Sequence, residues 1–215
     1  MIVSHSRKFI FIKAYKVAGT SVQHALAQTC DDNDLIIEDV NLALKLDQHA
    51  SPLAVRKLVG DKIWNSYRKI VIVRNPWDAF VSHYFFAHLG QNVKCPSYFD
   101  VFVWWNINGS MPLNKKHWLI GGKKWADDYI RFEDIEVECK NLFIDMGINF
   151  AGLGNDRSGL RPTIHYSLLY DLDTMRMVAK TYKDEIEQFG YKFEHIFQNS
   201  IDGSDNTEWK KIIQV

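Results

Sequence analysis

The chain has 215 residues, of which 47% are hydrophobic, and its 26 lysines and arginines balance its 26 aspartates and glutamates. This length fits one domain, the hydrophobic content excludes a chain that is disordered throughout, and the zero net charge argues against a protein that coats nucleic acid or an anionic membrane. The balance is a cancellation of blocks, because residues 1–30 carry +4, residues 31–50 carry −5 and residues 56–74 carry +5. A local anion-binding site is therefore compatible with the neutral total.

The cysteines and the apolar runs bear on the compartment of the protein. Cys30, Cys95 and Cys139 are far apart and odd in number, which argues against a disulfide framework or a zinc knuckle. No apolar run approaches the ~18 residues that span a bilayer, and the short polar start of the chain leaves no room for a signal peptide. We therefore expect a soluble protein without a membrane span, located in the cytoplasm.

Short apolar runs predict buried strands at residues 9–12 and 70–73, and a third strand is expected at 128–132. Each strand is followed by a turn and a helical pattern. The first expected helix follows the first strand and runs to about Ala27. Capping residues predict a second helix from Ser51-Pro52 to Gly60 and a third from Asn75-Pro76 to about Phe86. A fourth follows the third strand with the apolar face Ile135, Cys139, Leu142, Phe143 and Met146, and a fifth runs from about Asp173 to Gly190.

Strands that alternate with helices in this way predict an α/β fold with a central, mainly parallel sheet flanked by helices. No internal repeat or linker divides the chain. We expect residues 1–198 to form one domain and residues 199–215 to form a polar C-terminal tail.

The segment from Phe9 to Val22 reads strand, turn and helix, and its turn combines Lys16, Gly19, Thr20 and Ser21. Backbone N–H groups at a helix N-terminus attract anions, the glycine permits close approach of the backbone, and the lysine and hydroxyls add donors. The lysine precedes the glycine, so this is not the Gly-Lys-Ser/Thr order of a Walker A loop. An ordinary strand–turn–helix with a surface lysine is the alternative.

A second segment, from Ile70 to Tyr84, places Arg74 at the carboxyl end of a strand and Ser82 two helical turns later. Ligands of open α/β sheets bind at these strand ends, so the two side chains could hold a second anionic group. An ion pair of Arg74 with a nearby carboxylate and a solvated Ser82 hydroxyl are the alternatives. The strand does not end in an acid that could hold Mg²⁺, which disfavours a metal-dependent kinase.

The two segments together resemble the paired signatures of sulfotransferases that use 3′-phosphoadenosine 5′-phosphosulfate, in particular those of the carbohydrate-type branch. The resemblance covers about residues 8–195 and includes Tyr129-Ile-Arg-Phe-Glu-Asp134 and Phe189-Gly-Tyr-Lys-Phe193. Lys13, Tyr15 and Val17 replace residues that the family often has as His, Pro and Thr, so the handling of the acceptor could differ. The resemblance implies a three-layer, P-loop NTPase-like fold for the sulfotransferase domain.

The same resemblance implies the cofactor 3′-phosphoadenosine 5′-phosphosulfate, the product adenosine 3′,5′-bisphosphate, and no requirement for a metal. Lys16 is then a catalytic residue that stabilises charge on the leaving phosphate. Arg157-Ser158-Gly159 weakly matches a loop that some sulfotransferases place near the 3′-phosphate. The implied cofactor-binding residues are Lys16, Val17, Ala18, Gly19, Thr20 and Ser21 for the 5′-phosphosulfate, and Arg74 and Ser82 for the 3′-phosphate.

His49 is the candidate catalytic base, because it lies between the two motifs in a segment where the family often has a histidine. A neutral imidazole has suitable basicity near pH 7, and a nearby carboxylate of the acidic block that ends at His49 could raise it. A surface histidine or one that caps the next helix is the alternative. His83 and His88 are five residues apart without a third ligand in view, so we expect no metal site there.

We expect the acceptor to be a hydroxyl-bearing glycan or small molecule, and we expect no nucleic-acid partner. The resemblance to the carbohydrate-type branch favours a glycan. Two other functions remain open, namely a P-loop kinase-like phosphotransferase and a catalytically inactive nucleotide-binding module. The sequence leaves the oligomeric state undetermined.

Overall fold

The computed structural model describes residues 1–90, 94–109, 114–154 and 161–195. The expected tail at 199–215, the domain boundary at 198 and Arg157-Ser158-Gly159 lie outside these ranges. Within them, five strands form one mixed sheet in the order β3-β1-β2-β4-β5. The strands are β1 (Ile2–Ser4), β2 (Phe9–Ile12), β3 (Leu35–Ile36), β4 (Arg68–Val73) and β5 (Asp128–Arg131).

The prediction of a mainly parallel sheet is wrong, although the α/β class is confirmed. β2 pairs with β4 and β4 pairs with β5 in parallel, but β1 pairs with both β2 and β3 in the antiparallel sense. β1 and β3 have only three and two residues, so neither shows a hydrophobic period in the sequence. The short hairpin from β1 to β2 needs no crossover helix, which is why its pairing is antiparallel.

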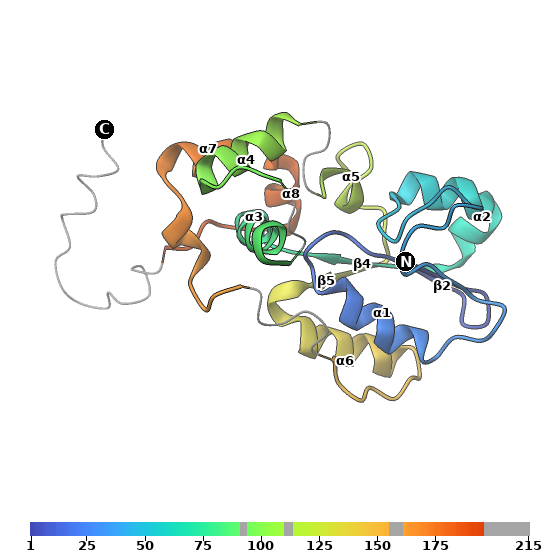
Figure 1. Cartoon of the computed structure of the whole chain (residues 1–215). Coiled ribbons are helices and arrows are strands. Elements are labelled where there is room, and N and C mark those ends of the chain that lie inside the picture. Colours follow the sequence, from blue (N-terminus) through green and yellow to red (C-terminus); the bar gives the residue numbers. More distant parts are fainter. Residues whose placement is uncertain (91–93, 110–113, 155–160, 196–215) are drawn as a thin grey trace.

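Helices flank this sheet (Figure 1), and two of them begin where their predicted capping residues lie. Ser51 accepts a hydrogen bond from the Ala54 N–H, and Asn75 accepts one from the Trp77 N–H. The helices are α1 (Gly19–Ala27), α2 (Pro52–Ser66), α3 (Pro76–Phe85), α4 (Phe99–Asn108), α5 (Lys115–Trp118), α6 (Ile135–Asp145), α7 (Leu172–Thr181) and α8 (Lys183–Phe189), with a π-helical turn at Phe86–Gly90 and 3₁₀ turns at Phe132–Asp134 and Tyr166–Leu169.

One of the helix ends is confirmed and one helix needs correction. The first helical segment of α2 does end at Gly60, whose φ of 77° and ψ of 162° are not helical, and a second helical segment follows it to Ser66. The single late helix is interrupted at Tyr182, whose φ of −108° and ψ of 27° separate α7 from α8. Gly190 does end α8, in the left-handed conformation that glycine adopts readily.

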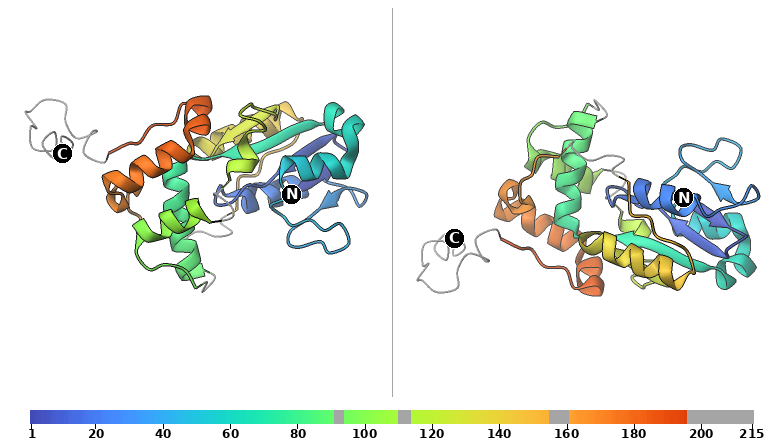
Figure 2. Two further views of the ribbon diagram at one scale, coloured as in Figure 1. Left: turned by 90° about the horizontal axis from the view of Figure 1, so that it is seen from above. Right: turned by 90° about the horizontal axis from the view of Figure 1, so that it is seen from below.

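Alternate side chains of β2 enter two hydrophobic clusters. Phe9 and Phe11 pack with Val22 of α1 and Phe143 of α6, whereas Ile10 belongs to a cluster that includes Val55 and Trp64 of α2. A strand that is buried on both faces reads as a continuous apolar run, as β2 does. α3, α4 and α7 lie beside one another at one end of the molecule (Figure 2). In the part of the chain that the structure describes, no helix is long and apolar enough to cross a membrane.

Candidate functional site

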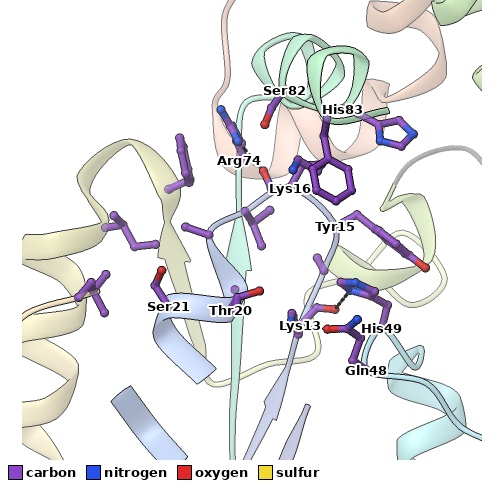
Figure 3. A pocket seen from close by; sticks show the side chains of 18 of the residues that line it. Lys13, Tyr15, Lys16, Thr20, Ser21, Gln48, His49, Arg74, Ser82 and His83 are labelled. Carbon is purple, nitrogen blue, oxygen red and sulfur yellow. Dashed lines mark hydrogen bonds between the residues drawn. The ribbon is translucent and has the colours of Figure 1, made fainter. Parts of the chain in front are cut away.

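A cavity of about 660 Å³ lies at the carboxyl ends of the parallel neighbours β2 and β4 (Figure 3). This volume and position are typical of ligand sites in α/β proteins. The cavity wall includes every residue for which the sequence predicts a catalytic or cofactor-binding role: Lys16, Val17, Ala18, Gly19, Thr20, Ser21, His49, Arg74 and Ser82. Segments that are far apart in the chain therefore meet around one space.

The loop before α1 has an unusual backbone. Lys16 and Ala18 both adopt positive φ angles, 57° and 56°, which cost a non-glycine residue about 1 kcal/mol or more. No side chain caps the N-terminus of α1, and no acidic residue lies in its first turn. Because the first-turn N–H groups of a helix have no intrahelical acceptor, Gly19, Thr20 and Ser21 present donors along the cavity wall.

Gly19 is required by a packing contact that the sequence does not indicate. A Cβ atom at this position would lie 2.7 Å from Cγ of Lys13. The Lys13 side chain is buried, and its Nζ donates to Oε1 of Gln48 at 2.5 Å. The missing side chain at residue 19 thus makes room for a buried lysine as well as leaving the backbone accessible.

Lys16 lies in the loop before α1, and its side chain contacts an aromatic ring. Its Nζ is 3.6 Å from the centroid of the Phe86 ring, close enough for a cation–π interaction. Its carbonyl oxygen accepts a hydrogen bond of 2.5 Å from Nη1 of Arg74. The two cationic residues of the predicted phosphate site are therefore joined through the backbone of the loop.

Arg74 is buried and forms the ion pair that the sequence left as the alternative reading of this residue. Its Nε and Nη2 lie 2.7 and 2.6 Å from Oδ2 of Asp78, and its guanidinium carbon is 3.6 Å from the Phe132 ring centroid. Burial lowers the pKa of Arg74, and the negative charge of Asp78 opposes that shift. Arg74 thus holds both the loop and the start of α3.

Asp78 pairs with a second arginine that the sequence analysis missed. Nη1 of Arg161 donates to Oδ1 of Asp78 at 2.5 Å, and Arg161 also lines the cavity. Burial acts to raise the pKa of Asp78, but the charges of Arg74 and Arg161 outweigh it and lower the pKa. Arg74, Arg161 and Asp78 together carry one net positive charge, which favours an anionic ligand. The carboxylates of Glu133, near Arg74, and Glu136, in the cavity lining, reduce this effect. Ser82 lines the same cavity.

His49 is held from several sides. Its Nδ1 lies 3.0 Å from the carbonyl oxygen of Lys13, and its ring stacks on Tyr15 with centroids 3.7 Å apart. A carbonyl can only accept, so Nδ1 carries the proton and Nε2 has the lone pair. The backbone N–H of His49 donates to Oδ1 of Asp47 at 2.7 Å. Because Ser51 caps α2, His49 is not its capping residue.

A nearby carboxylate does raise the pKa of His49, but burial outweighs it. Burial lowers the pKa of His49 to about 4, and the charge of Lys13 adds to this effect. Asp47 raises the pKa by less than burial lowers it. The imidazole is therefore neutral near pH 7, with Nε2 able to accept a proton but as a weaker base than an exposed histidine.

His83 is a further cavity residue without a predicted role. Its Nδ1 is buried and has no hydrogen-bond partner among the described residues. Burial lowers the pKa of His83 to about 4, and the charge of Lys16 lowers it further. In the described ranges, no three His, Cys, Asp or Glu side chains are placed to hold a metal ion.

No family model and no curated protein matches the sequence.

Proposed function

We propose that the protein is a sulfotransferase that moves a sulfuryl group from 3′-phosphoadenosine 5′-phosphosulfate to an acceptor hydroxyl. The observation that carries the proposal is the pairing of two anion-attracting walls in one cavity. One wall is the uncapped N-terminus of α1 with Thr20 and Ser21, and the other holds Arg74 and Arg161 around one carboxylate. A nucleotide with phosphate groups at both its 3′ and 5′ positions is a ligand with this charge pattern.

The donor set of the cavity fits such a nucleotide. Lys16, the α1 N–H groups and the two hydroxyls offer donors to the 5′-phosphosulfate, and Ser82 with Arg161 offers donors to the 3′-phosphate. The cavity volume of about 660 Å³ lies within the usual range for ligands of this size. The proposal includes a three-layer, P-loop-like arrangement of the parallel strands β2, β4 and β5 and the helices around them.

When bound, the nucleotide supplies a sulfuryl group on an activated phosphate. His49 Nε2 accepts the proton of the acceptor hydroxyl while the hydroxyl oxygen bonds to sulfur. Lys16 and the N-terminus of α1 stabilise the negative charge that remains on the leaving phosphate when its bond to sulfur breaks. The chain thus contributes positioning, charge stabilisation and a proton acceptor, and the proposed transfer requires no metal.

The proposed acceptor is a hydroxyl of a carbohydrate, on the basis of the resemblance to the carbohydrate-type branch. The proposed location is the cytoplasm, because Cys30, Cys95 and Cys139 are all free thiols.

Calorimetry and thermal unfolding with two ligands test the proposal. We expect adenosine 3′,5′-bisphosphate without metal to bind and raise the melting temperature, and Lys16→Gln to weaken the binding. Lys57→Gln, a change of an exposed lysine on α2, is the matched control and should bind normally. If ATP with Mg²⁺ raises the melting temperature and adenosine 3′,5′-bisphosphate does not, the proposal is contradicted and a kinase-like phosphotransferase is favoured.

The role of His49 has a separate test. His49→Ala should abolish turnover of 3′-phosphoadenosine 5′-phosphosulfate and preserve the binding of adenosine 3′,5′-bisphosphate. The exposed residue His24 provides the control variant His24→Ala, which should keep both properties. Near-normal turnover by His49→Ala would remove the base assignment, and a wild-type protein that binds without turnover would favour an inactive nucleotide-binding module.

A further inference from the structure

A short segment outside both sequence motifs contacts two separate stretches of chain that border the cavity. Asn114, immediately before α5, is buried and pairs with the backbone of Tyr15 at both of its polar groups. Oδ1 of Asn114 accepts from the Tyr15 N–H at 2.7 Å, and Nδ2 donates to the Tyr15 carbonyl oxygen at 2.7 Å. One amide side chain therefore fixes the residue that directly precedes Lys16 in the phosphate-binding loop.

His117 makes the second contact, one helical turn after Asn114. It is 1% exposed, and its Nε2 donates to the carbonyl oxygen of His49 at 2.8 Å. Its Nδ1 is buried and has no hydrogen-bond partner among the described residues, so the neutral ring has Nε2 as its donor. Nε1 of Trp125 donates to the His117 carbonyl at 3.0 Å and anchors this turn.

The two contacted residues also touch each other. Tyr15 and His49 stack at 3.7 Å, and the His117 ring meets the Tyr15 ring edge-on at 6.2 Å. Figure 3 shows Tyr15 and His49 together on one side of the pocket, apart from Arg74 and Ser82. The segment before and within α5 thus bridges the loop that leads to Lys16 and the backbone that carries His49.

We propose that Asn114 and His117 are positioning residues that fix the His49 ring relative to the phosphate-binding loop. Each acts through a backbone group of its neighbour, and neither lines the cavity. Buried hydrogen bonds of this kind restrict the orientation of the groups they join, and proton transfer depends strongly on that orientation. Their effect on turnover rests on the proposed function, whereas their effect on the His49 ring does not.

The length of the side chain at residue 117 allows a sharp test. The amide nitrogen of Gln reaches about as far as Nε2 of His, and that of Asn reaches only as far as Nδ1. We expect His117→Gln to keep the bond to the His49 carbonyl and His117→Asn to lose it. Turnover of 3′-phosphoadenosine 5′-phosphosulfate with water as the acceptor should then stay within about twofold in His117→Gln and fall about tenfold in His117→Asn, the rate equivalent of one hydrogen bond.

Two further readouts separate positioning from general destabilisation. The dissociation constant of adenosine 3′,5′-bisphosphate should change less than about twofold in both variants, because His117 holds the base and not the phosphates. The ¹⁵N spectrum of the His49 ring should show the Nδ1–H tautomer in wild type and His117→Gln, and altered ring signals in His117→Asn. The proposal would be overturned if His117→Gln and His117→Asn had the same turnover and the same His49 ring signals. It would also be overturned if the affinity for the nucleotide fell together with the turnover rate.

Asn114→Asp provides a second variant in case a change at His117 prevents folding. Aspartate keeps the acceptor for the Tyr15 N–H and loses the donor to the Tyr15 carbonyl. We expect altered His49 ring signals, because the stacked Tyr15 ring shifts, and unchanged signals would contradict the bridging role. If wild type does not bind the nucleotide, the proposed function fails, and the ¹⁵N spectra still decide whether α5 positions His49.

Discussion

The half-buried position of His49 predicts a measurable loss of stability in mild acid. Its pKa is lowered from 6.5 to about 4 in the folded protein, chiefly by burial. The unfolded chain therefore binds more protons between these values, so the contribution of His49 to stability is present above pH 6.5 and is lost as the pH falls toward 4. For this shift, lowering the pH from 7 to 5 removes about 2 kcal/mol of unfolding free energy through His49 alone.

Urea unfolding at pH 7 and pH 5 isolates this effect when wild type is compared with His49→Asn. Asparagine retains a donor near the position of Nδ1, so the bond to the Lys13 carbonyl can persist without a titrating group. Wild type should lose about 2 kcal/mol more than His49→Asn between the two pH values. The control His24→Asn changes an exposed histidine and should lose as much as wild type.

Other groups contribute to the acid loss of wild type but cancel in this comparison. Burial lowers the pKa of His83 to about 4 and also lowers the pKa of His117, so both add to the loss of stability as the pH falls below 6.5. These residues are present in wild type and in His49→Asn alike. Parallel losses in the two proteins, or an NMR titration of His49 near pH 6.5, would refute the reasoning that the half-buried His49 is neutral in the folded protein.

Three further predictions concern single contacts. Gly19→Ala should destabilise the protein by about 1–2 kcal/mol and weaken nucleotide binding, because the alanine Cβ would lie 2.7 Å from Cγ of Lys13. An unchanged free energy of unfolding in urea and an unchanged nucleotide affinity in calorimetry would contradict this prediction. Burial raises the pKa of Glu185, and its Oε2 lacks a hydrogen-bond partner among the described residues, so its ionised form is unfavourable in the folded state. Glu185→Gln should therefore raise the melting temperature at pH 8 and lose this advantage at pH 4. Arg161→Gln should weaken binding of adenosine 3′,5′-bisphosphate about tenfold in calorimetry, because it removes a cation from the cavity wall. The loss of stability should be small, since Arg74 still pairs with Asp78. An affinity equal to that of wild type would exclude Arg161 from the site.

Local sequence signals were sufficient for much of the fold. Apolar runs identified β2 and β4, and Ser51 and Asn75 cap the helices whose starts they predicted. The antiparallel part of the sheet was missed because β1 is too short to show a pattern. Gly60 predicted a helix end, and the first helical segment of α2 does stop there, but the sequence did not predict the second segment that follows it.

The candidate site shows a similar division between local and distant information. The motif at Lys16–Ser21 predicted which loop borders the cavity, since its residues are adjacent in the chain. The partners that hold this loop come from far away, with Asn114 separated from Tyr15 by 99 residues. Such contacts depend on how helices pack on the sheet, and no spacing rule in one sequence encodes them.

The contacts of Arg74 change how the anion-attracting wall is to be understood. Its Nε and Nη2 face Asp78 and its Nη1 donates to the Lys16 carbonyl, so this arginine is already engaged within the protein. Arg161 is engaged as well, with Asp78 and the Ile164 carbonyl, but its side chain is 24% exposed against 5% for Arg74. Since Asp78 can neutralise only one of the two guanidinium groups, Arg161 is the cation that a ligand in the cavity can approach. Arg74 therefore links the two walls: it fixes the loop of one, through Lys16, and holds the carboxylate that places the cation of the other.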